Sequence, residues 1–244
     1  MEPDEYRKMA GVEDAMWYYR ALHRHVVRSL RSALPASAAQ VLDAGCGTGG
    51  LLRQLHEAQP AWLLTGLDFS PLACELARER ASGVAVVQGS IAALPFPDAS
   101  FDAVVSCDVV CQVPDDGQAV REIYRCLKPG GVVVLTMPAY QWMYSYHDRS
   151  VANLRRYSRG QVNTLLGAAG FRVGRSTYWN MLPFPLAVVR RKIFPGKEAA
   201  SDVALFPAPV EAAFNGLMAL EHGWLSCGGR MPFGSSVLTV ARKA

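Results

Sequence analysis

The sequence predicts an α/β fold in which a doubly wound, mostly parallel sheet carries helices on both faces. Short apolar runs of strand length alternate with helix-like segments over most of the chain, which is typical of parallel sheets. A glycine-rich turn at residues 45–50 joins the first strand to a helix, an arrangement common at nucleotide sites. A long proline-containing stretch, residues 181–232, precedes the last strand candidate and is too long for a plain loop.

The expected elements follow one another in order. Ser70 and Pro71 are a favourable cap and first residue for a helix, and Gly170 is suited to end a later one. The expected strands are residues 41–43, 62–68, 84–88, 101–106, 132–137, 171–178 and 236–241. The expected helices are residues 13–34, 51–57, 71–80, 119–127, 159–169 and 210–220.

This order divides the chain into four parts. We expect residues 1–37 to form an N-terminal helical lid and residues 38–178 a Rossmann-like core. Residues 179–232 are interpreted as an inserted cap, or as a dimerisation element, and residues 233–244 supply the final strand of the core sheet. The sequence leaves open whether the protein is a monomer or a homodimer.

Composition excludes several classes of protein. The 244 residues are 50% hydrophobic and 19% charged, which argues against general disorder. A net charge of +4, without a basic stripe, does not indicate nucleic acid as a partner. No signal peptide and no apolar run of about 20 residues is visible, so a cytoplasmic location is expected. The six cysteines form no C-x-x-C pair and are expected to be reduced, with no metal site.

The turn at residues 41–50 points to a cofactor. Gly45, Gly47 and Gly50 match the dinucleotide spacing, and such turns bring backbone N–H groups close to a ligand. Asp43, however, would face a pyrophosphate and repel it. The same carboxylate would hold an ammonium group, which S-adenosylmethionine offers. An NAD-dependent oxidoreductase remains the alternative.

Four motifs taken together resemble those of class I S-adenosylmethionine-dependent methyltransferases. They are Leu-Asp-Ala-Gly-Cys-Gly-Thr-Gly at residues 42–49, Leu-Asp-Phe-Ser at 67–70, Leu-Pro-Phe-Pro-Asp-Ala-Ser-Phe-Asp at 94–102 and Leu-Lys-Pro-Gly-Gly at 127–131. The resemblance covers roughly residues 38–178. It implies a seven-stranded sheet with an antiparallel last strand, S-adenosylmethionine as cofactor, and methyl transfer as the reaction.

The resemblance also implies roles for individual residues. Asp43, Gly45 and Gly47 would meet the methionine part of the cofactor, because glycine lets the backbone approach the ligand. Asp68, 21 residues after Gly47, would accept hydrogen bonds from both ribose hydroxyls. Phe69 would pack on the adenine. A plain helix cap is the alternative for Asp68.

The chain departs from the family pattern in the adenine region and after the fourth strand. Ser90 stands where family members usually carry an acid, and a hydroxyl accepts a hydrogen bond more weakly. Ser90 and the Ile91 backbone remain candidates for the adenine site. Cys107 and Asp108 are expected at the mouth of the cofactor or acceptor site, although Cys107 is as well explained by packing.

Two flanking segments look like a bacterial subgroup of small-molecule methyltransferases. In residues 17–20, Trp-Tyr-Tyr-Arg, Tyr18 and Arg20 would close over the cofactor, with Arg20 on its carboxylate. The alternative is a helix whose aromatic face packs on the core. The second segment, residues 147–158, follows the fifth strand and should therefore lie near the ligand.

Aromatic residues around a His-Asp pair predict the acceptor site. His147, flanked by Tyr146 and Asp148, can take a proton near neutral pH, so these three residues are the catalytic candidates. A structural role for the loop is equally plausible, and Asn153 replaces a histidine common in the subgroup. The candidates for binding the acceptor are Gln112, Tyr140, Tyr144 and Arg156.

These observations predict transfer of a methyl group to an oxygen, nitrogen or carbon of a small molecule by in-line displacement. The sulfonium is already activated, so positioning and exclusion of water are the main tasks. A non-methylating relative that keeps the cofactor is a further alternative. The apolar, then basic, segment 179–194 leaves open peripheral contact with a membrane or a lipid-linked acceptor.

Overall fold

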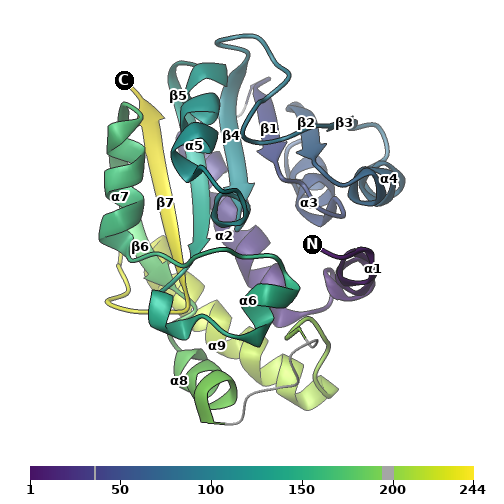
Figure 1. The fold of residues 1–244 in the computed structure, drawn as a ribbon, viewed down its shortest axis with the longest axis vertical. Helices are drawn as coiled ribbons and strands as arrows, with labels where there is room; N and C mark the ends of the chain where they lie inside the picture. The colour runs from purple at the N-terminus through teal and green to yellow at the C-terminus, as the bar shows by residue number, and fades with distance from the viewer. Residues whose placement is uncertain (36, 194–200) are drawn as a thin grey trace.

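A seven-stranded sheet is the centre of the computed structural model, which describes residues 1–35, 37–193 and 201–244 (Figure 1). The strand order is β3-β2-β1-β4-β5-β7-β6, and β7 runs antiparallel to both of its neighbours. The strands are β1 Gln40–Ala44, β2 Leu63–Asp68, β3 Ala85–Gln88, β4 Phe101–Cys107, β5 Leu127–Pro138, β6 Phe171–Trp179 and β7 Ser236–Lys243. The predicted fold class, including the antiparallel last strand, is confirmed.

Helices cover both faces of this sheet. They are α1 Pro3–Val12, α2 Trp17–Ala33, α3 Gly50–Ala58, α4 Pro71–Arg80, α5 Asp116–Cys126, α6 Tyr146–Ser150, α7 Arg159–Ala168, α8 Phe184–Val188 and α9 Ala208–Ser226. The Ser70 hydroxyl accepts from the Ala73 amide, as expected of a cap for α4. The expected first helix at residues 13–34 is shorter, and α1 in front of it was not expected.

The core lies between the sheet and its helices. Val132, Val133, Val134 and Leu135 of β5 are all fully buried, as is Leu42 of β1. Central parallel strands are covered on both faces, so an unbroken apolar run rather than an alternating one is what they require. The chain satisfies that requirement in its middle strands.

The expected insertion forms helices rather than an extended loop. In it α8 continues into a short π-helix, Val189–Ile193, and α9 packs along α2. Residues 194–200 of the expected cap lie outside the described residues. Figure 1 shows α1, α6, α8 and α9 gathered at the end of the sheet where the parallel strands terminate. None of the described helices is both long enough and apolar enough to cross a membrane.

Two glutamates of α9 fix the insertion to the core. Glu221 on α9 is buried and accepts from the amides of Asn180, Met181 and Leu182, which follow β6. Glu211 on the same helix accepts from the amide of Trp17, the first residue of α2. A carboxylate at a helix N-terminus is favoured by the helix dipole. These bonds fix the position of α9 relative to the carboxyl edge of the sheet.

Candidate active site

A cavity of about 610 Å³ lies between the carboxyl edge of the sheet and the helices α1, α2, α6 and α9. Ligands of open α/β sheets bind at this edge. The predicted site residues that line the cavity are Tyr18, Asp43, Gly45, Gly47, Asp68, Cys107, Gln112, His147 and Arg156. The predicted site residues that do not line it are Arg20, Phe69, Ser90, Ile91, Tyr140, Tyr144, Tyr146 and Asp148.

Asp43 is the most unusual group in the cavity. Its carboxylate is buried at the end of β1, and its Oδ1 has no hydrogen-bond partner in the described part of the chain. Burial, together with repulsion from Glu13 and Asp68, raises the pKa of Asp43 to about 8. A buried carboxylate without a partner is costly, unless a ligand supplies a donor or a positive charge. Asp43 therefore marks a position for a cationic group.

Asp68 is held by the glycine-rich turn and by α1. Its Oδ2 accepts from the Gly47 amide at 2.9 Å, and its Oδ1 accepts from the Ser70 amide at 2.9 Å. The Tyr6 hydroxyl donates to Oδ1 over 3.3 Å. An ionised carboxylate has about four acceptor positions, so a diol could bind here mainly by taking the place of Tyr6.

The glycines of the turn also lie very close to other protein atoms. A Cβ on Gly45, whose φ is +96°, would collide with the Val109 side chain. A Cβ on Gly47 would lie 2.8 Å from Cε of Met9. The amides of Gly45 and Cys46 both donate to the carbonyl of Leu67. In this conformation the turn packs closely on protein atoms.

Arg80 fastens the end of α1 over the turn. It donates to Glu13 at 2.9 Å, to Asp14 at 3.1 Å and to the Ala10 carbonyl at 2.7 Å. Glu13 is buried and also accepts from the Thr48 hydroxyl. Sequence reasoning missed Glu13 and Arg80, because nothing local shows that residues 67 positions apart will meet.

Tyr18 and Asp108 meet near the middle of the cavity. The Tyr18 hydroxyl donates to Asp108 at 3.0 Å, and the Thr136 hydroxyl donates to the other carboxylate oxygen at 3.3 Å. Burial raises the pKa of Asp108 and that of Tyr18. Asp108 has a φ of +58°, a left-handed conformation that directs its backbone away from the strand. The pair combines a basic carboxylate with a neutral phenol.

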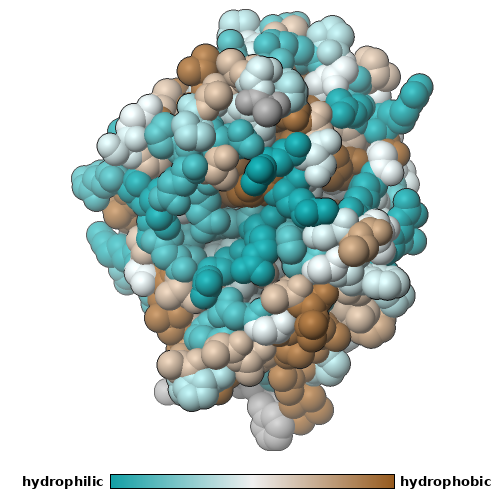
Figure 2. Space-filling view, turned by 180° about the vertical axis from the view of Figure 1, so that it is seen from behind, coloured by the Kyte–Doolittle hydropathy of each residue, from teal (hydrophilic) through white to brown (hydrophobic). Residues whose placement is uncertain are grey.

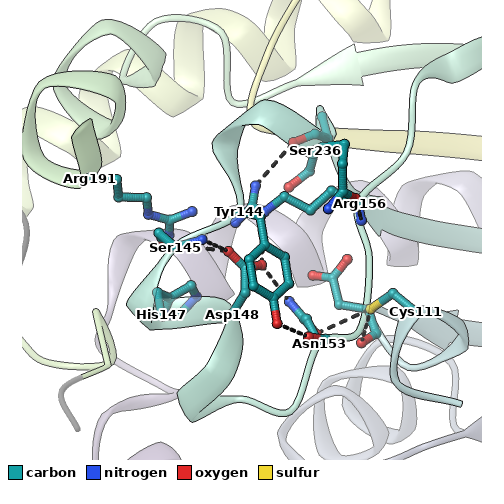
Figure 3. A network of polar contacts seen from close by, with 12 residues as sticks. Cys111, Tyr144, Ser145, His147, Asp148, Asn153, Arg156, Arg191 and Ser236 are labelled. Carbon is teal, nitrogen blue, oxygen red and sulfur yellow. Dashed lines mark hydrogen bonds and ion pairs between the residues drawn. The ribbon is translucent and has the colours of Figure 1, made fainter. Parts of the chain in front are cut away.

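Asp148 and Arg156 form a buried ion pair rather than an open catalytic group (Figure 3). The Arg156 Nε donates to Asp148 at 2.8 Å, and the two side chains are 2% and 0% exposed. Asp148 also accepts from the Ser145 amide and from the Asn153 side-chain amide. The Cys111 thiol donates to the Asn153 oxygen at 3.2 Å. Asp148 has no free edge left for an acceptor, because these donors occupy its oxygens.

His147 is the predicted catalytic residue that reaches the cavity. Its Nδ1 accepts from the Asp202 amide at 3.1 Å. Burial, together with the charge of Arg191, lowers the pKa of His147 to about 3, so the ring is neutral. A neutral imidazole that accepts at Nδ1 carries its proton on Nε2. His147 is therefore arranged to donate a hydrogen bond, not to take a proton.

The three predicted tyrosines between positions 140 and 146 hold the loop in place. The Tyr140 ring stacks on Tyr178 with 5.1 Å between the centroids. The Tyr144 hydroxyl donates to the Asn153 carbonyl, and the Tyr146 hydroxyl donates to Asp202. These aromatic side chains pack the loop against the sheet and the insertion, which is the structural alternative raised by the sequence.

The other predicted cofactor residues lie outside the cavity. Arg20 is exposed and lines a separate groove, because its position on α2 faces away from the buried side of the helix. Phe69 is 77% exposed. The Ser90 hydroxyl accepts from the Ala92 amide within its own turn, and Ile91 is buried.

Two further residues that line the cavity, Trp17 and Asn180, carry buried polar atoms without a partner in the described part of the chain. Trp17 Nε1 and Asn180 Oδ1 are buried and have no hydrogen-bond partner among the described residues. Asn180 has a φ of +60°, and its side-chain nitrogen donates to Ser235. No local pattern distinguishes Asn180 from an ordinary loop residue. Its placement follows from the hydrogen bonds that Glu221 accepts from the amides of residues 180–182.

Comparison with known proteins agrees with this geometry. Residues 42–135 match the family model of a methyltransferase domain. Residues 42–135 therefore carry a methyltransferase domain. A probable S-adenosylmethionine-dependent methyltransferase of Mycolicibacterium smegmatis is 32% identical over 169 residues, which are 68% of this chain and 64% of that protein.

Two further proteins resemble the methyltransferase domain. Demethylmenaquinone methyltransferase of Thermus thermophilus is 37% identical over 116 residues, 46% of this chain and 53% of that protein. The chain thus spans between half and two thirds of the length of these two relatives. The structure of an S-adenosylmethionine-dependent methyltransferase from Mesorhizobium loti shares the fold, with a TM-score of 0.61, 18% identity, and coverage of 95% of this chain and all of that chain.

Proposed function

We propose that the protein transfers a methyl group from S-adenosylmethionine to a small, largely apolar acceptor by in-line displacement. The observation that carries the proposal is Asp43, a buried carboxylate whose Oδ1 lacks a partner beside the glycine-rich turn. It fits the ammonium of the cofactor's methionine part. Asp68 fits the ribose, since a carboxylate can accept from two hydroxyls. The methyltransferase relatives favour this cofactor over NAD.

The chain's own residues would bind and orient the reactants. S-adenosylmethionine supplies an electrophilic methyl group on a positively charged sulfur. The segment α1, held by Arg80, and the first turn of α2 would act as a lid that excludes water. Asp108, whose pKa is raised by burial, is the carboxylate placed to accept a proton from an acceptor hydroxyl or amine. His147, with its proton on Nε2, would donate to the acceptor.

The acceptor would bind at the end of the cavity near Trp17 and Asn180. The residues there favour an acceptor that is mostly apolar and carries a few polar groups. Trp17 Nε1 offers a donor and Asn180 Oδ1 an acceptor, each buried and unpartnered among the described residues. Leu186, Val189 and Phe206 line the cavity and remain partly exposed at its rim. Such a rim supports entry of a molecule with an apolar tail. The demethylmenaquinone methyltransferases among the relatives are named for an acceptor of that kind.

Basic residues beside this rim support contact with a lipid-linked acceptor at a membrane surface. Arg190 and Lys192 follow the apolar side chains of α8 and are exposed. Lysine and arginine near a bilayer are attracted by anionic headgroups. The proposal therefore includes peripheral contact, with the insertion as the part of the chain that faces the lipid.

The first test is calorimetric titration with S-adenosylhomocysteine, with NAD as the control ligand. We expect binding in the micromolar range that Asp68→Ala weakens at least about 100-fold, since hydrogen bonds to a charged group contribute about 1.5–3 kcal/mol each. The matched control is Asp98→Ala, which removes an exposed carboxylate paired with Arg125 outside the cavity. Binding of NAD, or no effect of Asp68→Ala, would contradict the proposal.

The acceptor is then sought by release of S-adenosylhomocysteine. One arm uses demethylated quinones in lipid vesicles, and the other uses soluble phenols and amines of similar polarity. Each arm is run with the unchanged protein and with Asp108→Asn. A preference for the soluble acceptors would remove the membrane part of the proposal and leave the cofactor assignment intact.

A further inference from the structure

A second concave site lies on the opposite side of α2 from the cavity. The groove has a volume of about 930 Å³ and runs between α2, α3 and the end of α9. The face shown in Figure 2 is hollowed near its middle, and hydrophilic residues line the hollow. Four arginines of α2 line the groove: Arg20, Arg24, Arg28 and Arg31.

None of these four arginines forms an ion pair with a carboxylate in the described part of the chain. The two carboxylates of the groove, Asp14 and Glu57, both pair with Arg53 of α3. The Arg28 side chain donates to the carbonyl of Ser226, and the side chains of Arg20, Arg24 and Arg31 make no hydrogen bond or ion pair with any described residue. Elsewhere arginines such as Arg80, Arg125 and Arg156 are bound to carboxylates.

The arrangement is unfavourable for an isolated helix. Arg20, Arg24 and Arg28 are four residues apart, and like charges at this spacing repel and destabilise a helix. The helix α2 contains no acidic residue to relieve the repulsion. The positive charge of the arginines also affects His222, which lies beside them. Burial lowers the pKa of His222, and the charges of Arg24 and Arg28 contribute to the same shift. A bound anion would relieve both effects.

We propose that this groove binds a ligand with several phosphate groups in a row. Over the 11 residues from Arg20 to Arg31 the arginines span roughly 16 Å along the helix axis. Guanidinium groups bind phosphate oxygens in pairs with good geometry. Among the described lining residues none is aromatic except His222, which argues against single-stranded nucleic acid, whose bases need stacking partners. The concave shape argues against a flat membrane.

The ligand class is tested by calorimetric titration of the full chain with inorganic tripolyphosphate, with ATP and with hexaglutamate. We expect tripolyphosphate to bind at low salt and to bind more weakly when salt rises from about 50 to about 300 mM, because screening weakens exposed charge pairs. ATP binding equal to that of tripolyphosphate shows that phosphates suffice, and tighter binding identifies a nucleotide as the source. Hexaglutamate binding without phosphate binding overturns the proposal.

Matched variants locate the site. Arg24→Gln with Arg31→Gln should weaken tripolyphosphate binding at least about tenfold, since charge-assisted hydrogen bonds are lost. Arg121→Gln with Arg172→Gln removes the same charge from exposed positions on α5 and β6 and should change nothing. Equal weakening in the two double variants, or no binding by the unchanged protein, would exclude the groove. Retained binding of S-adenosylhomocysteine checks that each variant is folded.

His222 provides a readout inside the groove. The groups that face it are Arg24, Arg28 and His25, whose Nδ1 lies 3.2 Å from Nδ1 of His222. A phosphate ligand should raise the pKa of His222, measured from its ring resonances by NMR, because it offsets the two arginines. Binding that leaves the His222 resonances unchanged would place the ligand elsewhere and contradict the proposal.

Discussion

The two ends of the cavity are built in different ways. At the end with Asp43 and Asp68, the groups lie at the carboxyl ends of the neighbouring strands β1 and β2, and the Gly47 amide of the glycine-rich turn donates to Asp68. At the other end, Trp17, His147 and Asn180 come from distant segments. They are held by bonds such as those of Glu211 to Trp17 and of Asp202 to His147. The first end depends on the pairing of two neighbouring strands and the turns that follow them, and the second depends on contacts between helices and loops from distant parts of the chain.

The largest expected effect tests whether the second end depends on the buried ion pair beneath it. Arg156→Met leaves Asp148 charged, buried and without its main partner, so we expect a loss of about 3–5 kcal/mol in the free energy of unfolding. Chemical denaturation measures it. Arg155→Met is the matched control, because Arg155 pairs with Asp116 at a partly exposed position and should cost less than about 1 kcal/mol. If both variants lose equally little free energy of unfolding, Arg156 is not needed for stability and is better explained as a residue that binds the acceptor.

Most of the fold was predictable because its signals are local. The strand runs of β1, β2, β4 and β5 are apolar, and Ser70 caps α4 as expected. α1 was missed: it begins with a proline and has two acidic residues in its first turn, which are weak signals within a polar segment. The start of α5 was placed three residues late, because the cap is Asp115, which accepts from the Gln118 amide.

The site was predictable mainly where a sequence motif marks its residues. Asp43, Gly47 and Asp68 line the cavity as predicted. Tyr146 and Asp148 do not, because their hydrogen bonds are taken by Asp202 and by Arg156. Those partners lie on other segments of the chain, and no periodicity in the sequence pairs them. Asn180 could not be predicted for the same reason.

A smaller effect separates stability from function at the first end. The folded-state pKa of Asp43, about 8, lies above an unfolded value near 3.9, so its contribution to stability is fully present below about pH 4 and is lost as pH rises towards 8. The side chain of the Asp43→Asn variant does not ionise, so its stability does not fall in this way as pH rises. At pH 8 we expect the variant to be more stable than the unchanged protein by at least about 2 kcal/mol, and at pH 4 the difference should nearly vanish.

Denaturation at several pH values, together with S-adenosylhomocysteine titration, checks this prediction. The same variant should bind the cofactor more weakly, since the carboxylate is missing. Asp102→Asn is a control of opposite sign. Burial opposes ionisation of Asp102, but the Gln40 amide and Lys128 outweigh it and lower its pKa, so the variant should lose a little stability near neutral pH. A stability of Asp43→Asn that does not change with pH would show that Asp43 is not strained.

The smallest effect concerns the contact between α1 and the first end. The Tyr6 hydroxyl occupies an acceptor position on Asp68 over 3.3 Å, where the proposed ribose would bind. Tyr6→Phe keeps the ring and removes the competing donor. We expect S-adenosylhomocysteine to bind about 2- to 10-fold more tightly, the equivalent of one hydrogen bond of about 0.5–1.5 kcal/mol.

Calorimetry on Tyr6→Phe and on Tyr124→Phe distinguishes this from a general effect of losing a hydroxyl, because Tyr124 packs on Phe171 away from the cavity. Weaker binding by Tyr6→Phe would mean that the hydroxyl contacts the cofactor itself. In that case α1 would belong to the binding site, and the first end would also depend on a contact 62 residues apart in sequence. The contrast between the two ends would then be one of degree.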